Sequence, residues 1–126
     1  MSMRSPLGRV RGLGSAKSGF EHWWAQRLTA IALIPLALWF VAGVVSLAGA
    51  DYDATVDWLS KPFVSVALVL LIVATFYHAA LGLQVVIEDY VHHEGAKLAL
   101  VILEKFACAV LAVTGLYAVL KLALGG

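Results

Sequence analysis

One histidine, His78, lies deep inside a long apolar stretch of the sequence. It follows Pro62 by 16 residues and precedes Glu88 by 10, which in a helix places it about 15 Å from the Glu88 end. Ala74 and Gly82 lie four residues before and after it, on the same helix face. An imidazole between two small residues leaves a flat surface for a porphyrin edge, so we predict a ligand to haem iron. A polar contact between helices or a proton path is the alternative.

No second histidine lies in an apolar stretch, so the other axial ligand of a bis-histidine haem would come from another subunit.

Asp89 and Tyr90 end the same stretch as His78. Eleven helical steps return Asp89 to within about 20° of His78, about 16 Å away. A tyrosine hydroxyl can donate to a carbonyl, and a carboxylate beside it can orient it or relay a proton. The pair predicts a polar pocket at the membrane surface, with ordinary interface anchoring as the alternative.

Arg27, with Gln26 and Thr29, marks the entry to the first apolar stretch. Its guanidinium can pair with an anionic cofactor group such as a haem propionate. It can equally extend its charged end to the membrane surface while its stem stays in the apolar layer.

Other polar residues give weaker candidates. Glu104 and Lys105 lie near one end of the last apolar stretch, from which both can reach the interface. His92 and His93 are adjacent, but the sequence offers no third metal ligand at a suitable spacing. Cys108 stands alone in an apolar helix, where it is interpreted as a small buried residue.

The composition excludes a soluble enzyme. Of 126 residues, 62% are hydrophobic and 13% are charged, against about 45–50% and about 25% in soluble domains. A small soluble domain buries only about 60–70% of its unfolded surface and cannot hide so many apolar side chains. A single cysteine also excludes a disulfide scaffold. We therefore predict an integral membrane protein.

Charge-free stretches predict an all-α fold with three transmembrane helices, at about 28–49, 62–88 and 98–121. About 20 apolar residues cross the hydrocarbon core as a helix, and the alternation that transmembrane strands need is missing. A secretory signal has an apolar region of about 7–15 residues, so we expect the longer first helix to be retained. The chain is then one domain, 1–126, with a basic tail at about 1–22.

The charges also predict an orientation. The tail and the entry to the first span carry five basic residues and one acid: Arg4, Arg9, Arg11, Lys17 and Arg27 against Glu21. The loop after the first span carries three acids and one base: Asp51, Asp53 and Asp57 against Lys61. By the positive-inside rule the N-terminus lies on the cytoplasmic or matrix side and the C-terminus on the opposite side.

These motifs together resemble a known family. The segment from Trp24 to Ala30 contains Arg-x-Thr-Ala, and His78 is followed after ten residues by Asp89 and Tyr90. Both patterns, with the length and the number of spans, are similar to the small hydrophobic membrane-anchor subunit of succinate dehydrogenase (respiratory complex II). The patterns typical of its sister anchor, Ser-x-x-x-Arg before the first helix and Arg-His after the haem ligand, are missing.

The resemblance implies a role for each candidate residue. His78 would be an axial ligand of haem b, shared with the cytochrome b-type sister anchor, which would supply the opposite ligand. Tyr90 would hydrogen-bond a carbonyl of ubiquinone, the substrate, with Asp89 beside it. Arg27 would lie near the haem propionates.

The resemblance also implies partners and a location. The chain would anchor a flavoprotein subunit and an iron–sulfur subunit in membrane lipid, without contact to nucleic acid. Electrons from succinate would pass to quinone, linking the tricarboxylic acid cycle to respiration. The chain itself would be non-catalytic, because it lacks a Gly-rich dinucleotide loop, a cysteine cluster and a nucleophile–base pair. We expect a bacterial inner (plasma) membrane rather than a mitochondrial one.

Alternatives remain open at this point. One is the anchor of a fumarate reductase or of another haem b quinone protein, because the direction of electron flow depends on potentials and on the quinone. Another is a non-redox three-helix assembly or structural protein, in which His78 is a polar contact in the core.

Overall fold

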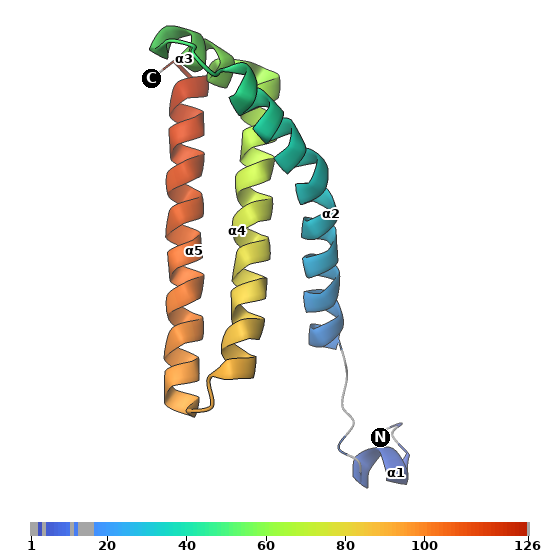
Figure 1. The fold of residues 1–126 in the computed structure, drawn as a ribbon. Coiled ribbons are helices and arrows are strands. Elements are labelled where there is room, and N and C mark those ends of the chain that lie inside the picture. The colour runs from blue at the N-terminus through green and yellow to red at the C-terminus, as the bar shows by residue number, and fades with distance from the viewer. Residues whose placement is uncertain (1–2, 4, 11, 13–16, 126) are drawn as a thin grey trace.

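The computed structural model describes residues 3, 5–10, 12 and 17–125, and every regular element in that part of the chain is a helix. The helices are α1 (Pro6–Val10), α2 (Lys17–Ser46), α3 (Tyr52–Ser60), α4 (Pro62–Tyr90) and α5 (Glu94–Ala123) (Figure 1). The predicted all-α fold is therefore confirmed.

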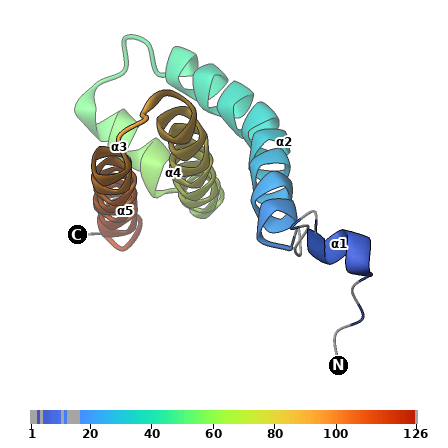
Figure 2. The ribbon, with the colours of Figure 1, turned by 90° about the horizontal axis from the view of Figure 1, so that it is seen from below.

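The three long helices form an open arc with α4 in the middle. α4 packs against both α2 and α5, whereas α2 and α5 do not contact each other. Viewed along the helices, α2 and α5 lie on different sides of α4 (Figure 2). The short helix α3 lies across one end of the arc, called here the α3 end, and the turn at residues 91–93 marks the other, the loop end.

Three of the described helices are long and apolar enough to cross a membrane: Gly19–Ser46, Pro62–Tyr90 and Glu94–Ala123. At 1.5 Å per residue, a helix of 28 residues is about 42 Å long, more than the hydrocarbon core of about 30 Å. Their ends therefore extend into the headgroup layers. Many large apolar side chains on them are exposed, as lipid or partner subunits require. The three predicted spans are confirmed.

The helix boundaries differ from the predicted ones because charge marks the edge of the apolar layer, not the end of a helix. The first long helix begins at Lys17 instead of about 28, and the last extends over Glu94–Ala123 instead of about 98–121. The first also ends at Ser46 and not at 49. There the chain turns through Gly49, whose φ of 80° lies in the left-handed region that favours glycine.

Local side-chain bonds explain where the later helices begin. Asp51 Oδ1 accepts a hydrogen bond from the Ala54 N–H at 2.9 Å and caps α3. His93 Nδ1 accepts one from the Ala96 N–H at 3.1 Å and caps α5 in the same way. Pro62 opens α4, where a missing N–H breaks no helical bond. His93 thus has a structural role as the N-cap of α5.

The loop after the first span was not expected to be helical, but α3 forms there and fastens the long helices together. Trp58 of α3 stacks on Trp39 of α2, with ring centroids 5.7 Å apart. A Cβ atom at Gly43 would lie 2.6 Å from the Trp58 ring, so only glycine allows this contact. Ser60 Oγ also lies 3.1 Å from the Leu122 carbonyl oxygen of α5. α3 therefore connects α2 and α5, which do not touch directly.

Candidate functional site

His78 lies on the side of α4 that faces α2, and its side chain is half-buried. Its Nδ1 is 3.1 Å from Oγ1 of Thr29, a residue 49 positions away in the sequence. The imidazole lies 12 residues before the end of α4 at Tyr90, about 18 Å along the helix. His78 is therefore at membrane depth, and a polar partner is present on the neighbouring helix.

The bonds of Thr29 determine which ring nitrogen of His78 carries the proton. The Thr29 hydroxyl donates to the Ala25 carbonyl oxygen at 2.7 Å, the shorter of its contacts to acceptors. A hydroxyl has only one hydrogen, and the shorter contact to Ala25 takes it, so we assign the 3.1 Å contact as His78 Nδ1–H donating to Thr29 Oγ1. A neutral imidazole carries one N–H, and Nε2 therefore keeps its lone pair. Within the described residues Nε2 has no hydrogen-bond partner, so it is free to bind a metal ion.

The residues near His78 on α4 are small, and Gln26 of α2 is a polar side chain close by. Ala74, one turn away, is buried. Gly82, one turn on the other side, faces Gln26 of α2, whose Nε2 would be 3.7 Å from a Cβ at that position. The Gln26 Oε1 atom is buried and has no hydrogen-bond partner among the described residues. An apolar groove of about 450 Å³ starts at Thr29 and follows α2 and α4 toward the α3 end.

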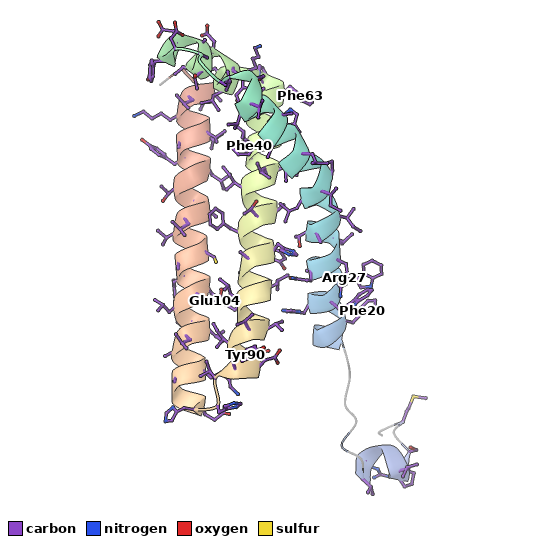
Figure 3. The ribbon with its side chains drawn as sticks, viewed as in Figure 1. Phe20, Arg27, Phe40, Phe63, Tyr90 and Glu104 are labelled. Carbon is purple, nitrogen blue, oxygen red and sulfur yellow. The ribbon has the colours of Figure 1, made fainter. Side chains whose placement is uncertain are left out.

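Arg27 is not brought next to His78. Two helical steps separate it from Thr29, so the two side chains leave α2 on nearly opposite faces. Figure 3 shows Arg27 and Phe20 on the side of α2 that is turned away from α4. The Arg27 guanidinium carbon lies 5.5 Å from the centroid of the Trp23 ring, within cation–π distance. In the described part of the chain Arg27 forms no ion pair.

Asp89 and Tyr90 end α4 at the loop end, and both side chains are exposed. Figure 3 shows Tyr90 at this end of the helix. The exposed fraction of Tyr90 is 79%. Neither side chain has a hydrogen-bond partner within the described residues, so the tyrosine hydroxyl and the carboxylate remain available to a ligand.

A polar hollow lies near them and was not anticipated from the sequence. It has a volume of about 480 Å³ and is lined by Gly19 and His22 of α2 and by Gln84, Val85 and Glu88 of α4. Only the folded structure brings these two segments together, more than 60 residues apart, because α2 begins at Lys17, about eleven residues earlier than the charge pattern predicted.

A chain of polar contacts joins α4 to α5 near the loop end. Lys105 Nζ donates to Gln84 Oε1 at 2.9 Å, and Gln84 Nε2 donates to Glu88 Oε1 at 2.8 Å. Glu104 is only 9% exposed, and its Oε1 atom lies 3.6 Å from Lys105 Nζ. The expectation that Glu104 reaches the interface is wrong, because its side chain turns toward α4 (Figure 3).

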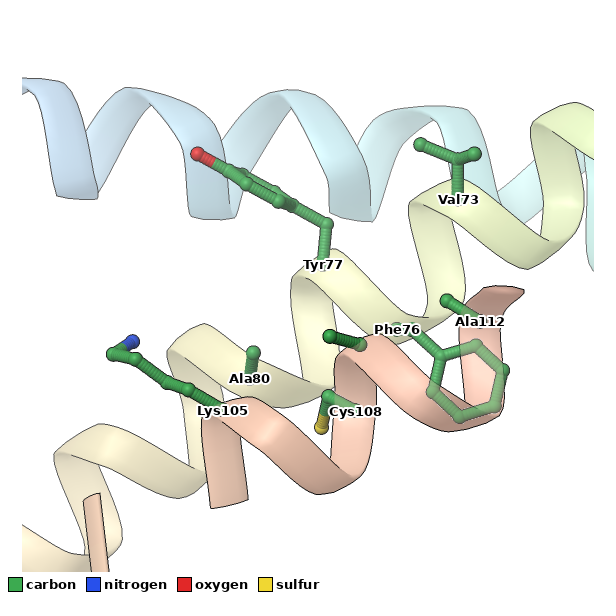
Figure 4. Close-up of a pocket in the computed structure, with 8 residues that line it drawn as sticks. Val73, Phe76, Tyr77, Ala80, Lys105, Cys108 and Ala112 are labelled. Atoms are coloured by element: carbon green, nitrogen blue, oxygen red, sulfur yellow. The ribbon is translucent and has the colours of Figure 1, made fainter. Parts of the chain in front are cut away.

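A second apolar groove, of about 290 Å³, lies between α4 and α5 with Lys105 and Cys108 on its α5 wall (Figure 4). Val73 and Tyr77 line both this groove and the one between α2 and α4. The two grooves therefore form one apolar face on α4, which lipid or the helix of another subunit can cover.

Three apolar helices and one imidazole at membrane depth define a small polytopic membrane subunit. The described residues contain no group of three or more His, Cys, Asp or Glu side chains that could hold a metal ion by themselves. His78 can therefore contribute a single ligand.

Comparison with known proteins gives the family. The sequence model of the succinate dehydrogenase/fumarate reductase transmembrane subunit matches residues 1–116. A relative from Rickettsia conorii is 36% identical over 108 residues, covering 85% of this chain and 86% of the relative. One from Paracoccus denitrificans is 29% identical over 121 residues, covering 96% and 93%. Both are named succinate dehydrogenase hydrophobic membrane anchor subunits.

The chain therefore belongs to the family of succinate dehydrogenase/fumarate reductase transmembrane subunits. The resemblance noted from Arg27, Thr29, His78, Asp89 and Tyr90 is confirmed at the level of the family, and the relatives carry the name of the succinate dehydrogenase anchor.

Proposed function

We propose that this chain is the small hydrophobic anchor of a succinate dehydrogenase in a bacterial inner membrane. It holds a flavoprotein and an iron–sulfur subunit at the membrane, together with a cytochrome b-type sister anchor. Family membership and the names of the relatives support this role. The N-terminus and the loop end lie on the cytoplasmic side in this proposal, on the support of the basic tail and the acidic loop at residues 51–57.

His78 supplies one axial ligand to a haem b shared with the sister anchor. The observation that carries this step is the state of the imidazole: Nδ1 is engaged by Thr29, and Nε2 keeps an unpaired lone pair. A lone imidazole without further ligands in the described residues fits a haem whose opposite ligand comes from the partner. Haem b, when bound, supplies a one-electron carrier within the membrane.

Tyr90 and Asp89 form one wall of the ubiquinone site. The hydroxyl of Tyr90 donates to a quinone carbonyl, and Asp89 orients that hydroxyl or supplies a proton. Their exposure at the loop end supports this role, because an incoming headgroup can reach both. Protons for the reduced quinone then come from the cytoplasm.

Arg27 binds a haem propionate in this proposal. Its charge and its position near the membrane surface favour the role, but in the isolated chain its guanidinium packs on Trp23. A propionate would reach it from the side of α2 that is turned away from α4.

The decisive experiment is a spectrum of the assembled complex. The chain is expressed with its three partner subunits, and reduced-minus-oxidised spectra are recorded for His78→Ala and for the matched control His92→Ala. His92 is exposed and lies outside the spans. The haem b bands should be lost or shifted in His78→Ala and unchanged in the control. An assembled His78→Ala complex with normal bands would show that the ligand lies elsewhere.

A further inference from the structure

Thr29 combines two interactions in one hydroxyl group. It donates to the Ala25 carbonyl oxygen of its own helix at 2.7 Å, and its oxygen lies 3.1 Å from His78 Nδ1 across the α2–α4 contact, where by the assignment above it accepts. In the sequence, this threonine is notable only for its place in the Arg-x-Thr-Ala segment.

We propose that Thr29 is a positioning residue for His78, which fixes its protonated nitrogen and the orientation of its ring. With the proton held on Nδ1, Nε2 is always the nitrogen that can bind iron. With the ring hydrogen-bonded to α2, the imidazole plane cannot rotate freely about its side chain. The inference rests on the proposed haem ligation by His78.

The bond within α2 does not explain why threonine is present. Thr114 in α5 makes the same bond to the carbonyl four residues earlier, Val110, at 2.7 Å, and it has no side-chain partner on another helix. Thr55 in α3 likewise bonds to the Asp51 carbonyl at 2.9 Å. Among these three, the second contact to an imidazole is particular to Thr29.

The orientation of the hydroxyl matters as much as its presence. Because its hydrogen is committed to Ala25, its oxygen faces His78 only as an acceptor. When the Nδ1–H group donates to an acceptor, the Nε2 atom becomes a stronger electron donor to a bound metal. Hydrogen-bond partners of metal-bound histidines generally have this effect. Stronger donation stabilises ferric over ferrous iron and so lowers the midpoint potential.

The test compares Thr29→Val, which keeps the shape but removes the acceptor, with Thr29→Ser, which keeps the hydroxyl. Thr114→Val is the matched control, because it loses only the bond within its own helix. In the purified four-subunit complex we expect Thr29→Val to raise the haem midpoint potential and to alter the ferric low-spin EPR signal. We also expect haem affinity to fall about 10-fold or more, because loss of a hydrogen-bond partner of a metal ligand typically lowers metal affinity about 10–100-fold. Thr29→Ser and Thr114→Val should match the wild type.

Failure of this inference can be told from failure of the proposed function. If His78→Ala loses haem but Thr29→Val has wild-type potential and EPR signal, Thr29 does not position the ligand. If His78→Ala keeps its haem, the ligation itself is wrong. Should Thr29→Val not assemble, Thr29→Ala is measured in its place. If neither variant assembles although Thr29→Ser does, the hydroxyl serves helix packing and the inference is overturned.

Discussion

The hydroxyl of Tyr90 is free at the end of α4, and removing it tests the quinone site with a change of one atom. If the Tyr90 hydroxyl donates to a quinone carbonyl, as proposed, Tyr90→Phe removes that hydrogen bond, which costs about 1–3 kcal/mol. The efficiency of quinone reduction should therefore fall roughly 5–150-fold. Haem content should not change, because the ring still anchors the helix end. The measurement is the steady-state rate with a ubiquinone analogue.

Two controls accompany Tyr90→Phe. Succinate oxidation with a dye that accepts electrons from the hydrophilic subunits should proceed at the normal rate. Tyr52→Phe should have no effect, because Tyr52 is equally exposed, at 78%, but lies at the α3 end. Equal loss in both assays would indicate defective assembly, and a normal quinone rate would reduce Tyr90 to an interface anchor.

Arg27→Leu separates the two interpretations of this arginine. If the guanidinium pairs with a propionate, its removal leaves negative charge in a low-dielectric site and favours ferric iron, so the midpoint potential should fall. Arg27→Lys keeps the charge and should retain most of the potential. Redox titration of the haem measures both. An unchanged potential and haem content in Arg27→Leu would assign Arg27 to its stacking on Trp23 alone.

The candidate residues could be chosen from the sequence because charged and polar groups are rare inside apolar spans. The residues that contact them could not be chosen in this way. The contact between Thr29 and His78 joins positions 49 residues apart and depends on how two helices are rotated against each other. Neither helix has a polar stripe that would fix that rotation in the sequence. For the same reason the burial of Glu104 against α4 was missed.

At the level of elements, the contact of α3 with α2 depends on the missing side chain of Gly43. In Gly43→Val the new methyl groups collide with the Trp58 ring, which is held by its stack on Trp39. We expect a loss of about 1–3 kcal/mol in the free energy of unfolding, as for other overpacked contacts. The midpoint of thermal unfolding of the purified complex reports this loss.

Ala42→Val is the matched control, since Ala42 neighbours Gly43 on α2 but is exposed. It should leave the unfolding midpoint unchanged. Adding Trp58→Ala to Gly43→Val removes the collision, so the double variant should lose less than the sum of the single losses. Strict additivity would mean that the two residues do not meet in the assembled protein.

The spans were predictable because crossing the hydrocarbon core requires about 20 apolar residues, a condition visible in sequence. α3 was not predictable, because its nine residues contain two acids and follow a third, the capping Asp51, so the segment is interpreted first as a polar loop. Its signals were local and weak: Asp51 as a helix cap, and Trp58 facing back toward the span. The early start of α2 was missed because a helix continues past the charges that mark the edge of the apolar layer.

For the whole molecule, the orientation can be tested by reporter fusions. Alkaline phosphatase is active only outside the cytoplasm, so a fusion after Gly126 should be active and one after His92 inactive. A fluorescent protein that matures only in the cytoplasm should give the opposite result at both sites. The prediction follows from the basic residues before the first span and the acids after it. Reversed activities would move Tyr90 and the quinone site to the other face of the membrane.

The packing of α2 against α4 but not against α5 has a consequence for biogenesis. α4 and α5 are joined by three residues, 91–93, and form a hairpin that can assemble by contacts close in sequence as the chain is inserted. α2 is fastened at the α3 end by the stacked Trp39 and Trp58. Swinging α2 about that pivot would uncover His78 and leave the hairpin intact, so a prosthetic group bound by His78, as proposed here, would have a route to it after insertion.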